Sequence, residues 1–233
     1  DGMQAPHSSV EAAAASHVRA LGALCEQGPF KLLGHSFGGW IAFEMARQLQ
    51  ARKAPVSELI LLDSTAPSAL GPRHRHIDRI GALSELADLL AQQAERPLNL
   101  PAAALPHMTE DDQMRHLHQA MAEVGLISRN TPVQNIAGLF RVFAENLNTA
   151  YQPASGVEAP VLVARAQEKG SSDAHPRDAS AWREWAPIRS ALDVPGNHMT
   201  LLARPHIDVV AQALGHGSPG CMPPPSHQVA EVS

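Results

Sequence analysis

Apolar and polar residues alternate in blocks along the first third of the chain, and the blocks predict helices and strands in turn. A helix is expected from residue 9 to about residue 27, with Ser9 as its N-cap and Glu11 in its first turn. Its apolar stripe has helical spacing and consists of Ala13, Val18, Leu21, Leu24 and Cys25. The apolar run 30–33 predicts a strand, and residues 40–49 have the pattern of a second, amphipathic helix.

The rest of the chain continues this alternation with one interruption. A continuous apolar run at 58–63 ends in an acidic residue and indicates a parallel strand that is buried on both faces. Further strands are expected at 160–166 and 191–194, and a closing helix at 201–214. Between the strands expected at 58–63 and 160–166, the apolar residues take a helical spacing, and helices are expected at 77–93, 110–124 and 133–150. The sequence therefore predicts an α/β fold with a mostly parallel sheet.

The helical interruption sets the expected domain organisation. Residues 1–70 and 152–214 are expected to form one core, into which residues 71–151 are inserted. Such an insertion is typical of a lid over the active-site end of a sheet, and a small bundle that merely packs on the domain is the alternative. Residues 215–233 are rich in glycine, serine and proline and are expected to be a disordered tail.

The segment Gly34-His35-Ser36-Phe37-Gly38-Gly39 joins the first predicted strand to the second predicted helix. Gly-x-Ser-x-Gly in this setting is the pattern of a nucleophile elbow, a tight turn that presents the serine hydroxyl at the edge of a sheet. Gly34 and Gly38 are expected to let the two backbones approach, and Gly39 to extend that clearance into the helix. The N–H of Phe37 is the expected oxyanion-hole donor. An ordinary turn rich in glycine and serine is the alternative.

A serine nucleophile needs a base that takes its proton and an acid that orients the base. His198 follows the last predicted strand within a Pro-Gly turn, where an elbow hydrolase has its base. Asp63, after the strand that follows the elbow, and Asp173, in a polar loop after the next strand, compete for the role of the acid. We favour Asp63, because the end of a strand fixes it beside Ser36 and a buried carboxylate needs a partner such as a histidine N–H.

Composition excludes several other classes of function. The formal net charge of -5 leaves no basic stripe, so nucleic acid is not an expected partner. No apolar run approaches the length of a membrane span and no signal peptide opens the chain, so we expect a cytoplasmic protein that does not bind a membrane. Cys25 and Cys221 are expected to be reduced thiols. The histidine pairs lack a matching Cys, Asp or Glu set, so no metal is expected; they are His74/His76 and His116/His118.

Four segments together resemble the thioesterase domains that end non-ribosomal peptide and polyketide synthetases: residues 28–39, 42–46, 61–64 and 195–198. The resemblance covers most of residues 1–214 and implies an α/β-hydrolase fold with a helical lid. In that family the acid follows the strand after the elbow, which supports Asp63. The resemblance implies that an acyl or peptidyl chain passes from a carrier protein's phosphopantetheine thiol to Ser36 and leaves by attack of water or of an internal nucleophile. His198 would act first as base and then as acid.

The resemblance also sets expectations for ligands and for activity. No cofactor is expected to bind directly, because the substrate arrives on the phosphopantetheine of an acyl or peptidyl carrier protein. Leu139 and Phe143 are expected to line the acyl pocket beneath the lid. Family members have further early strands and a loop that donates a second oxyanion N–H, so we expect this chain to be an N-terminally truncated fragment with impaired activity. A stand-alone editing thioesterase, a small-ester hydrolase and a truncated non-catalytic interaction domain stay open as alternatives.

Overall fold

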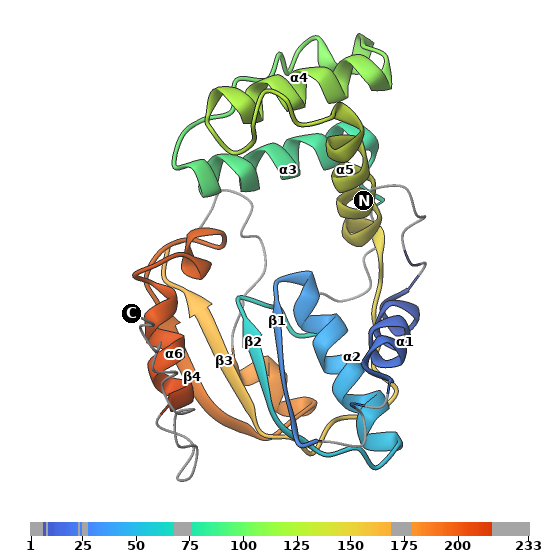
Figure 1. Ribbon diagram of the computed structural model, residues 1–233, viewed down its shortest axis with the longest axis vertical. Coiled ribbons are helices and arrows are strands. Elements are labelled where there is room, and N and C mark those ends of the chain that lie inside the picture. Colours follow the sequence, from blue (N-terminus) through green and yellow to red (C-terminus); the bar gives the residue numbers. More distant parts are fainter. Residues whose placement is uncertain are drawn as a thin grey trace, which may run out of the picture.

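A four-stranded parallel sheet forms the centre of the molecule (Figure 1). The computed structural model describes residues 7, 9–22, 24, 28–67, 76–168 and 179–215. The strands lie side by side in chain order, each parallel to the next: β1 (Phe30–His35), β2 (Val56–Leu62), β3 (Val161–Ala166) and β4 (Ile188–Val194). Because all four run in the same direction, the residues that follow them meet at one edge of the sheet. The predicted α/β fold class is confirmed.

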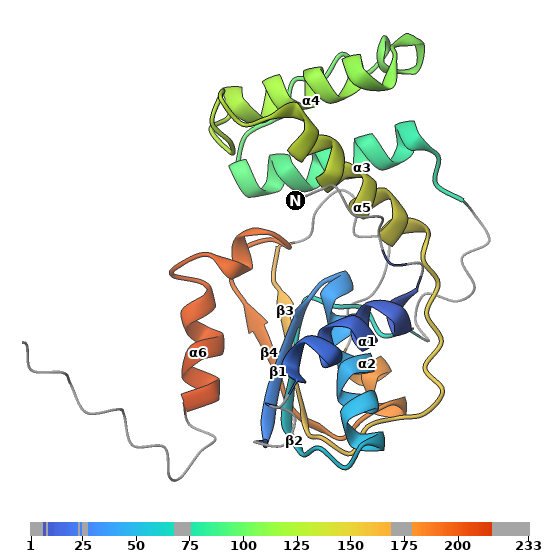
Figure 2. The ribbon, with the colours of Figure 1, turned by 45° about the vertical axis from the view of Figure 1, so that its right-hand side comes forward.

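Helices cover both faces of this sheet, which explains the continuous apolar runs 59–62 in β2 and 161–164 in β3. Alternate residues of a strand point to opposite faces. Leu59 and Leu61 therefore lie in the cluster on the side of α1 (Val10–Leu21) and α2 (Phe37–Ala51), together with Trp40, Phe43 and Trp182. Ile60 and Leu62 lie on the other side, against Leu201 and the helix α6 (Ile207–Gly215). Figure 2 shows the two helical layers on either side of the strands.

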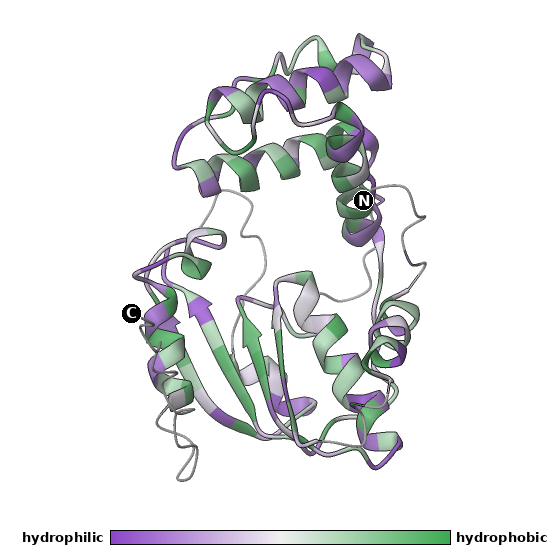
Figure 3. Ribbon diagram, in the orientation of Figure 1, coloured by the Kyte–Doolittle hydropathy of each residue, from purple (hydrophilic) through white to green (hydrophobic). Residues whose placement is uncertain are grey.

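Three further helices form a separate body beyond the carboxyl edge of the sheet (Figure 1). They are α3 (Arg79–Ala94), α4 (Glu110–Glu123) and α5 (Val133–Asn148), and we call them the α3–α5 bundle. Their apolar stripes pack mostly against one another in a cluster that includes Leu83, Leu86, Leu90, Met114, Leu117, Met121, Ile136 and Phe140. Figure 3 shows α4 as the most hydrophilic of the three on its outer side. The stripes expected from the sequence are therefore largely satisfied inside the bundle.

Several predicted element boundaries are wrong, each for a local reason. The first helix ends at Leu21, because Gly22 takes a φ of 50° and closes it. Leu24, expected in the apolar stripe, is 52% exposed. The closing helix begins at Ile207 rather than residue 201, because Pro205 disfavours a helical conformation at the preceding residue. Short 3₁₀ helices that the pattern did not predict occur at Leu105–His107, Ala179–Glu184 and Thr200–Leu202.

Some expectations concern residues that the structure does not describe. Asp173, His74, Cys25, Cys221 and the tail after Gly215 all lie outside the described residues. None of the helices in the described part of the chain has the length and apolar character that crossing a membrane requires. Within the same residues, no three His, Cys, Asp or Glu side chains come together as a metal-binding group. His118, one of the paired histidines, instead contacts the backbone carbonyl of Thr131 at 2.8 Å.

Candidate active site

Ser36 lies in the turn between β1 and α2, as the elbow pattern predicts. Its φ of 55° is in the left-handed region, which a non-glycine residue adopts only when its surroundings impose it. The N–H of Ser36 donates to the carbonyl of Leu62 at 2.9 Å, which ties the turn to the end of β2. The Ser36 side chain does not cap the following helix. Its hydroxyl is therefore free for another partner.

The glycines of the elbow do not all serve the purpose expected of them. A Cβ on Gly34 would overlap the backbone of Gly38 and Gly39, so strand and helix can cross here only at a glycine. A Cβ on Gly39 would overlap the side chain of Ser64, which lies just beyond β2. A Cβ on Gly38, in contrast, would meet nothing within 4 Å. The expectation that Gly38 itself provides clearance is wrong, because its neighbours leave open space there.

Ser36, His198 and Asp63 form one continuous hydrogen-bonded series. The Ser36 Oγ lies 3.0 Å from His198 Nε2, and His198 Nδ1 lies 2.6 Å from Asp63 Oδ2. His198 is 5% exposed and Asp63 is 2% exposed. With Nδ1 donating its proton to the carboxylate, Nε2 is left as the acceptor that a serine hydroxyl needs. The three residues selected from the sequence are thus brought together at the carboxyl edge of the sheet.

Asp63 is held from its own backbone as well as through its side chain. It follows β2 directly with a φ of 46°, and its N–H donates to the carbonyl of Ala164 at 2.7 Å. Its Oδ1 accepts the N–H of Ala166 at 2.9 Å, which leaves Oδ2 to face His198. These contacts come from β3, the neighbouring strand. The competing candidate, Asp173, lies outside the described residues.

Two residues that the sequence motifs do not single out hold the turn that carries His198. The Nε2–H of His35 donates to the backbone carbonyl of His198 at 2.8 Å, and the two imidazole rings lie 4.6 Å apart. Asn197 Oδ1 accepts the N–H groups of Met199 and Thr200, both at 2.9 Å. The signal for Asn197 was available, since asparagine commonly caps a helical turn. No local pattern pairs His35 with a residue 163 positions away.

Phe37 is the first residue of α2, so its N–H lies at the helix N-terminus directly after Ser36. The first N–H groups of a helix have no acceptor within it, and the helix dipole places partial positive charge there. An oxygen that develops negative charge beside Ser36 would be stabilised by such a donor. The position of Phe37 therefore fits the oxyanion role expected of it.

A buried network behind the elbow joins α2 to the segment that returns from the α3–α5 bundle. The Tyr151 hydroxyl donates to Glu44 Oε2 at 2.8 Å, and Arg47 and Gln48 also donate to the Glu44 carboxylate. Burial opposes ionisation of Glu44, but hydrogen bonds from Arg47, Gln48 and Tyr151 outweigh it and hold its pKa below the usual 4.5. Burial and the bond to Glu44 raise the pKa of Tyr151, so its hydroxyl stays a donor.

The same network fixes the side chains next to the elbow. The Tyr151 ring lies 5.8 Å from that of Trp40, whose Nε1–H donates to the carbonyl of Thr65 at 2.8 Å. Trp40 in turn lies 5.6 Å from the ring of Phe37. The start of α2 is thereby packed against the segment that follows α5.

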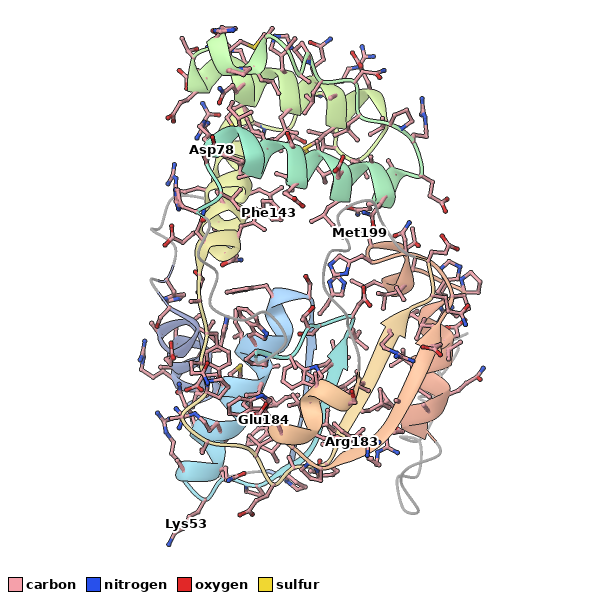
Figure 4. All side chains as sticks on the ribbon, turned by 180° about the vertical axis from the view of Figure 1, so that it is seen from behind. Lys53, Asp78, Phe143, Arg183, Glu184 and Met199 are labelled. Atoms are coloured by element: carbon pink, nitrogen blue, oxygen red, sulfur yellow. The ribbon has the colours of Figure 1, made fainter. Side chains whose placement is uncertain are left out.

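The two residues expected to line an acyl pocket lie on α5. Leu139 and its neighbour Val142 are apolar, yet their side chains are 46% and 42% exposed. Phe143 is partly buried against the bundle's own cluster, and Figure 4 shows it on the side of α5 that faces the sheet. Met199, next to His198, lies on the opposite side of the same space in that view.

Comparison with known proteins identifies the family of the chain. The family model described as "Thioesterase domain" matches residues 1–216. The chain is 33% identical over 182 residues to the spectinabilin polyketide synthase system protein NorC of Streptomyces orinoci, with 76% of this chain and 6% of that protein covered. It is 26% identical over 183 residues to an inactive atromentin synthetase of Paxillus involutus, with 77% of this chain and 19% of that protein covered.

A solved structure shares the fold. The Vlm2 thioesterase domain superposes with a TM-score of 0.61 at 23% identity, over 90% of this chain and 76% of that one. The chain spans a fifth or less of the length of the two relatives, which are multidomain synthetases or synthases. The elbow, the hydrogen-bonded series and the family match together place this chain in the thioesterase domain family, among relatives of non-ribosomal peptide and polyketide synthetase thioesterases.

Proposed function

We propose that this chain releases an acyl or peptidyl chain from the phosphopantetheine thioester of a carrier protein through an ester on Ser36. The observation that carries the proposal is the hydrogen-bonded series from Ser36 through His198 to Asp63, in a chain of the thioesterase family. The multidomain relatives support a carrier protein as the partner, because their matched regions belong to much longer synthetases.

In the first half of the reaction, His198 Nε2 accepts the proton of the Ser36 hydroxyl while the serine oxygen attacks the thioester carbonyl. Asp63 keeps the Nδ1 proton in place and stabilises the imidazolium. The N–H of Phe37 stabilises the charge on the carbonyl oxygen. The carbon–sulfur bond then breaks, His198 returns its proton to the departing thiolate, and the acyl group stays on Ser36 as an ester.

In the second half, a nucleophile gives its proton to His198 and attacks the ester, and His198 then protonates the Ser36 oxygen. Water as the nucleophile yields a free acid, and a hydroxyl or amine of the acyl chain itself yields a ring. Which one reacts depends on how well the ester is shielded from water.

We assign the shielding to the α3–α5 bundle, acting as a lid whose helix α5 contacts the acyl chain. Support comes from Leu139 and Val142, apolar residues that the bundle leaves exposed, and from Phe143 on the side that faces the sheet. An acyl chain needs apolar walls beyond the sheet edge, and these side chains offer them.

Covalent labelling tests the core of this proposal. A fluorophosphonate probe is expected to label the wild-type chain and the control Ser57→Ala, whose hydroxyl bonds the carbonyl of Phe30, but not Ser36→Ala. A synthetic acyl-pantetheine thioester should add the mass of its acyl group to the same serine. An unlabelled wild-type chain would favour a non-catalytic interaction domain instead.

Substrate choice separates the remaining alternatives. Turnover of simple esters without any thioester turnover would indicate a small-ester hydrolase. Turnover confined to short acyl groups would indicate an editing thioesterase, whereas long or peptidyl chains are expected for a releasing domain.

A further inference from the structure

The side chain of Asn197 makes contacts in two directions at once. Its Oδ1 accepts the N–H groups of Met199 and Thr200, which closes the turn around His198. Its Nδ2–H donates to the backbone carbonyl of Gln92 at 3.2 Å. Gln92 belongs to the last turn of α3, 105 positions away and in a different body of the molecule. One amide thus joins the α3–α5 bundle to the turn that carries the histidine.

The Gln92 carbonyl is well suited to receive that bond. The last carbonyls of a helix lack partners within it and carry the negative end of the helix dipole, so they attract an N–H donor and repel a carboxylate. The N–H of Glu95 also approaches this carbonyl, at 3.4 Å. The Gln92 side-chain oxygen is buried with no hydrogen-bond partner among the described residues, although Gln93 and Glu95 beside it are exposed.

The His198 turn is otherwise held from the core. Thr200 Oγ1 accepts the N–H of Asn197 at 2.9 Å, and Leu201 is fully buried against the sheet. His35 holds the carbonyl of His198 from β1. Loss of the bond to Gln92 would therefore release α3 but leave the turn in place, whereas loss of the Oδ1 contacts would loosen the turn itself.

We propose that Asn197 is a positioning residue that anchors the α3–α5 bundle to the catalytic turn of His198. Its Oδ1 keeps the turn closed in either position of the bundle, and its Nδ2–H holds α3 over the site only when the bundle is docked. This inference rests on the proposed function, since it takes His198 as the base and the bundle as the lid.

Substitutions at Asn197 separate the two halves of its amide. Asn197→Asp keeps an oxygen for the turn and sets a carboxylate against the Gln92 carbonyl. Asn197→Ser keeps a cap oxygen on a side chain too short to reach α3, so it replaces the first variant if that one folds poorly. Asn197→Ala removes both contacts, and Asn130→Asp, at an exposed turn in the bundle, controls for the added charge.

Two independent measurements distinguish the docking of α3 from the state of the His198 turn. Hydrogen–deuterium exchange of residues 79–94 reports the docking of α3 and needs no catalysis. The rate of fluorophosphonate labelling of Ser36 reports the His198 turn. The Asp and Ser variants are expected to exchange several-fold to tenfold faster in α3 and to raise KM for long acyl-pantetheine substrates. Their labelling rate, and kcat on a short acyl thioester, should fall clearly less than those of Asn197→Ala.

The remaining variants give the contrast. Asn197→Ala is expected to speed exchange in α3 and also to slow labelling about tenfold or more, and Asn130→Asp to change neither. Unchanged exchange in α3 of both the Asp and Ser variants would overturn the proposal, as would a fall in labelling equal to that of Asn197→Ala. If the wild-type chain takes no label at all, the serine mechanism fails, and the exchange data still decide whether Asn197 holds the bundle.

Discussion

Replacing Asp63 by asparagine tests the orienting role of this carboxylate most directly, because the structure dictates how the new side chain would lie. Asp63 Oδ1 accepts the N–H of Ala166, so an asparagine keeps its oxygen on that side. Its NH₂ group then faces His198 Nδ1 and donates to it. The imidazole must carry its proton on Nε2, the atom that has to accept the proton of Ser36.

The size of the effect follows from two contributions. Restoring the reactive tautomer requires the amide to flip and set its NH₂ against the N–H of Ala166, and an unsatisfied buried donor costs about 1–3 kcal/mol. That cost corresponds to roughly 5- to 150-fold in rate. The variant also loses the charge that stabilises the imidazolium. In the best-studied triad the same substitution lowers turnover about 10⁴-fold, or roughly 5 kcal/mol, and we expect a similar total here.

The assay is steady-state turnover of an acyl-pantetheine thioester by the wild-type chain, Asp63→Asn, Asp173→Asn and Asp193→Asn. The last is a matched control, since Asp193 pairs with Arg165 at 2.7 Å at the surface of the same sheet. We expect only Asp63→Asn to be severely impaired, with a normal unfolding transition. More than a tenth of wild-type activity in that variant would refute the orienting role. A severe loss of activity in Asp173→Asn instead would identify Asp173, after the next strand, as the acid.

Other predictions address the elbow, the buried network and the α3–α5 bundle. Gly39→Ala should lower the free energy of unfolding by about 1–3 kcal/mol, because its Cβ would overlap Ser64, whereas Gly38→Ala should not destabilise; denaturant melts compare the two. Tyr151→Phe should lower the free energy of unfolding by about 1.5–3 kcal/mol, since it removes a hydrogen bond to a buried carboxylate. The pKa of Glu44 is depressed in the folded protein, so the ionised carboxylate stabilises the fold above pH 4.5, and this stabilisation is lost as the pH falls through the lower folded-state pKa. The unfolding midpoint of the wild-type chain should therefore drop more steeply in acid than that of Glu44→Gln. Leu139→Ser should shift chain-length preference or the ratio of cyclised to hydrolysed product while the control Gln119→Ser does not, and identical product profiles by mass spectrometry would mean that α5 does not contact the acyl chain.

The elements of the core could be predicted from the sequence because their signals are local. The apolar runs of β2 and β3 reflect burial on both faces, and the glycine-rich turn reflects the crossing of strand and helix at Gly34. Helix ends were predicted less well, because they depend on single residues such as Gly22 and Pro205 that the apolar period does not register.

The α3–α5 bundle shows a different limit. Spacing predicted three helices, and all three are present, but the same apolar stripes could face a pocket or one another. The structure packs most of them together, and this choice depends on how α4 and α5 fold back on α3. No periodicity within one helix records that arrangement. Leu139 is an example, since it has the spacing of the apolar stripe of α5 but is exposed and does not join the bundle's cluster.

The site itself illustrates why neighbouring strands decide which candidate residues meet. Ser36, Asp63 and His198 each follow a strand of one parallel sheet, so the direction of the strands alone brings them to a common edge. Their final geometry comes from contacts that cross between strands: Ser36 N–H to Leu62, Asp63 Oδ1 to Ala166, and His35 to the carbonyl of His198. The motif therefore predicts the chemistry of the residues, and the order of the strands predicts which of them can act together. The contacts of His35 and Asn197 depend on backbone positions that become neighbours only after the sheet and the bundle have formed.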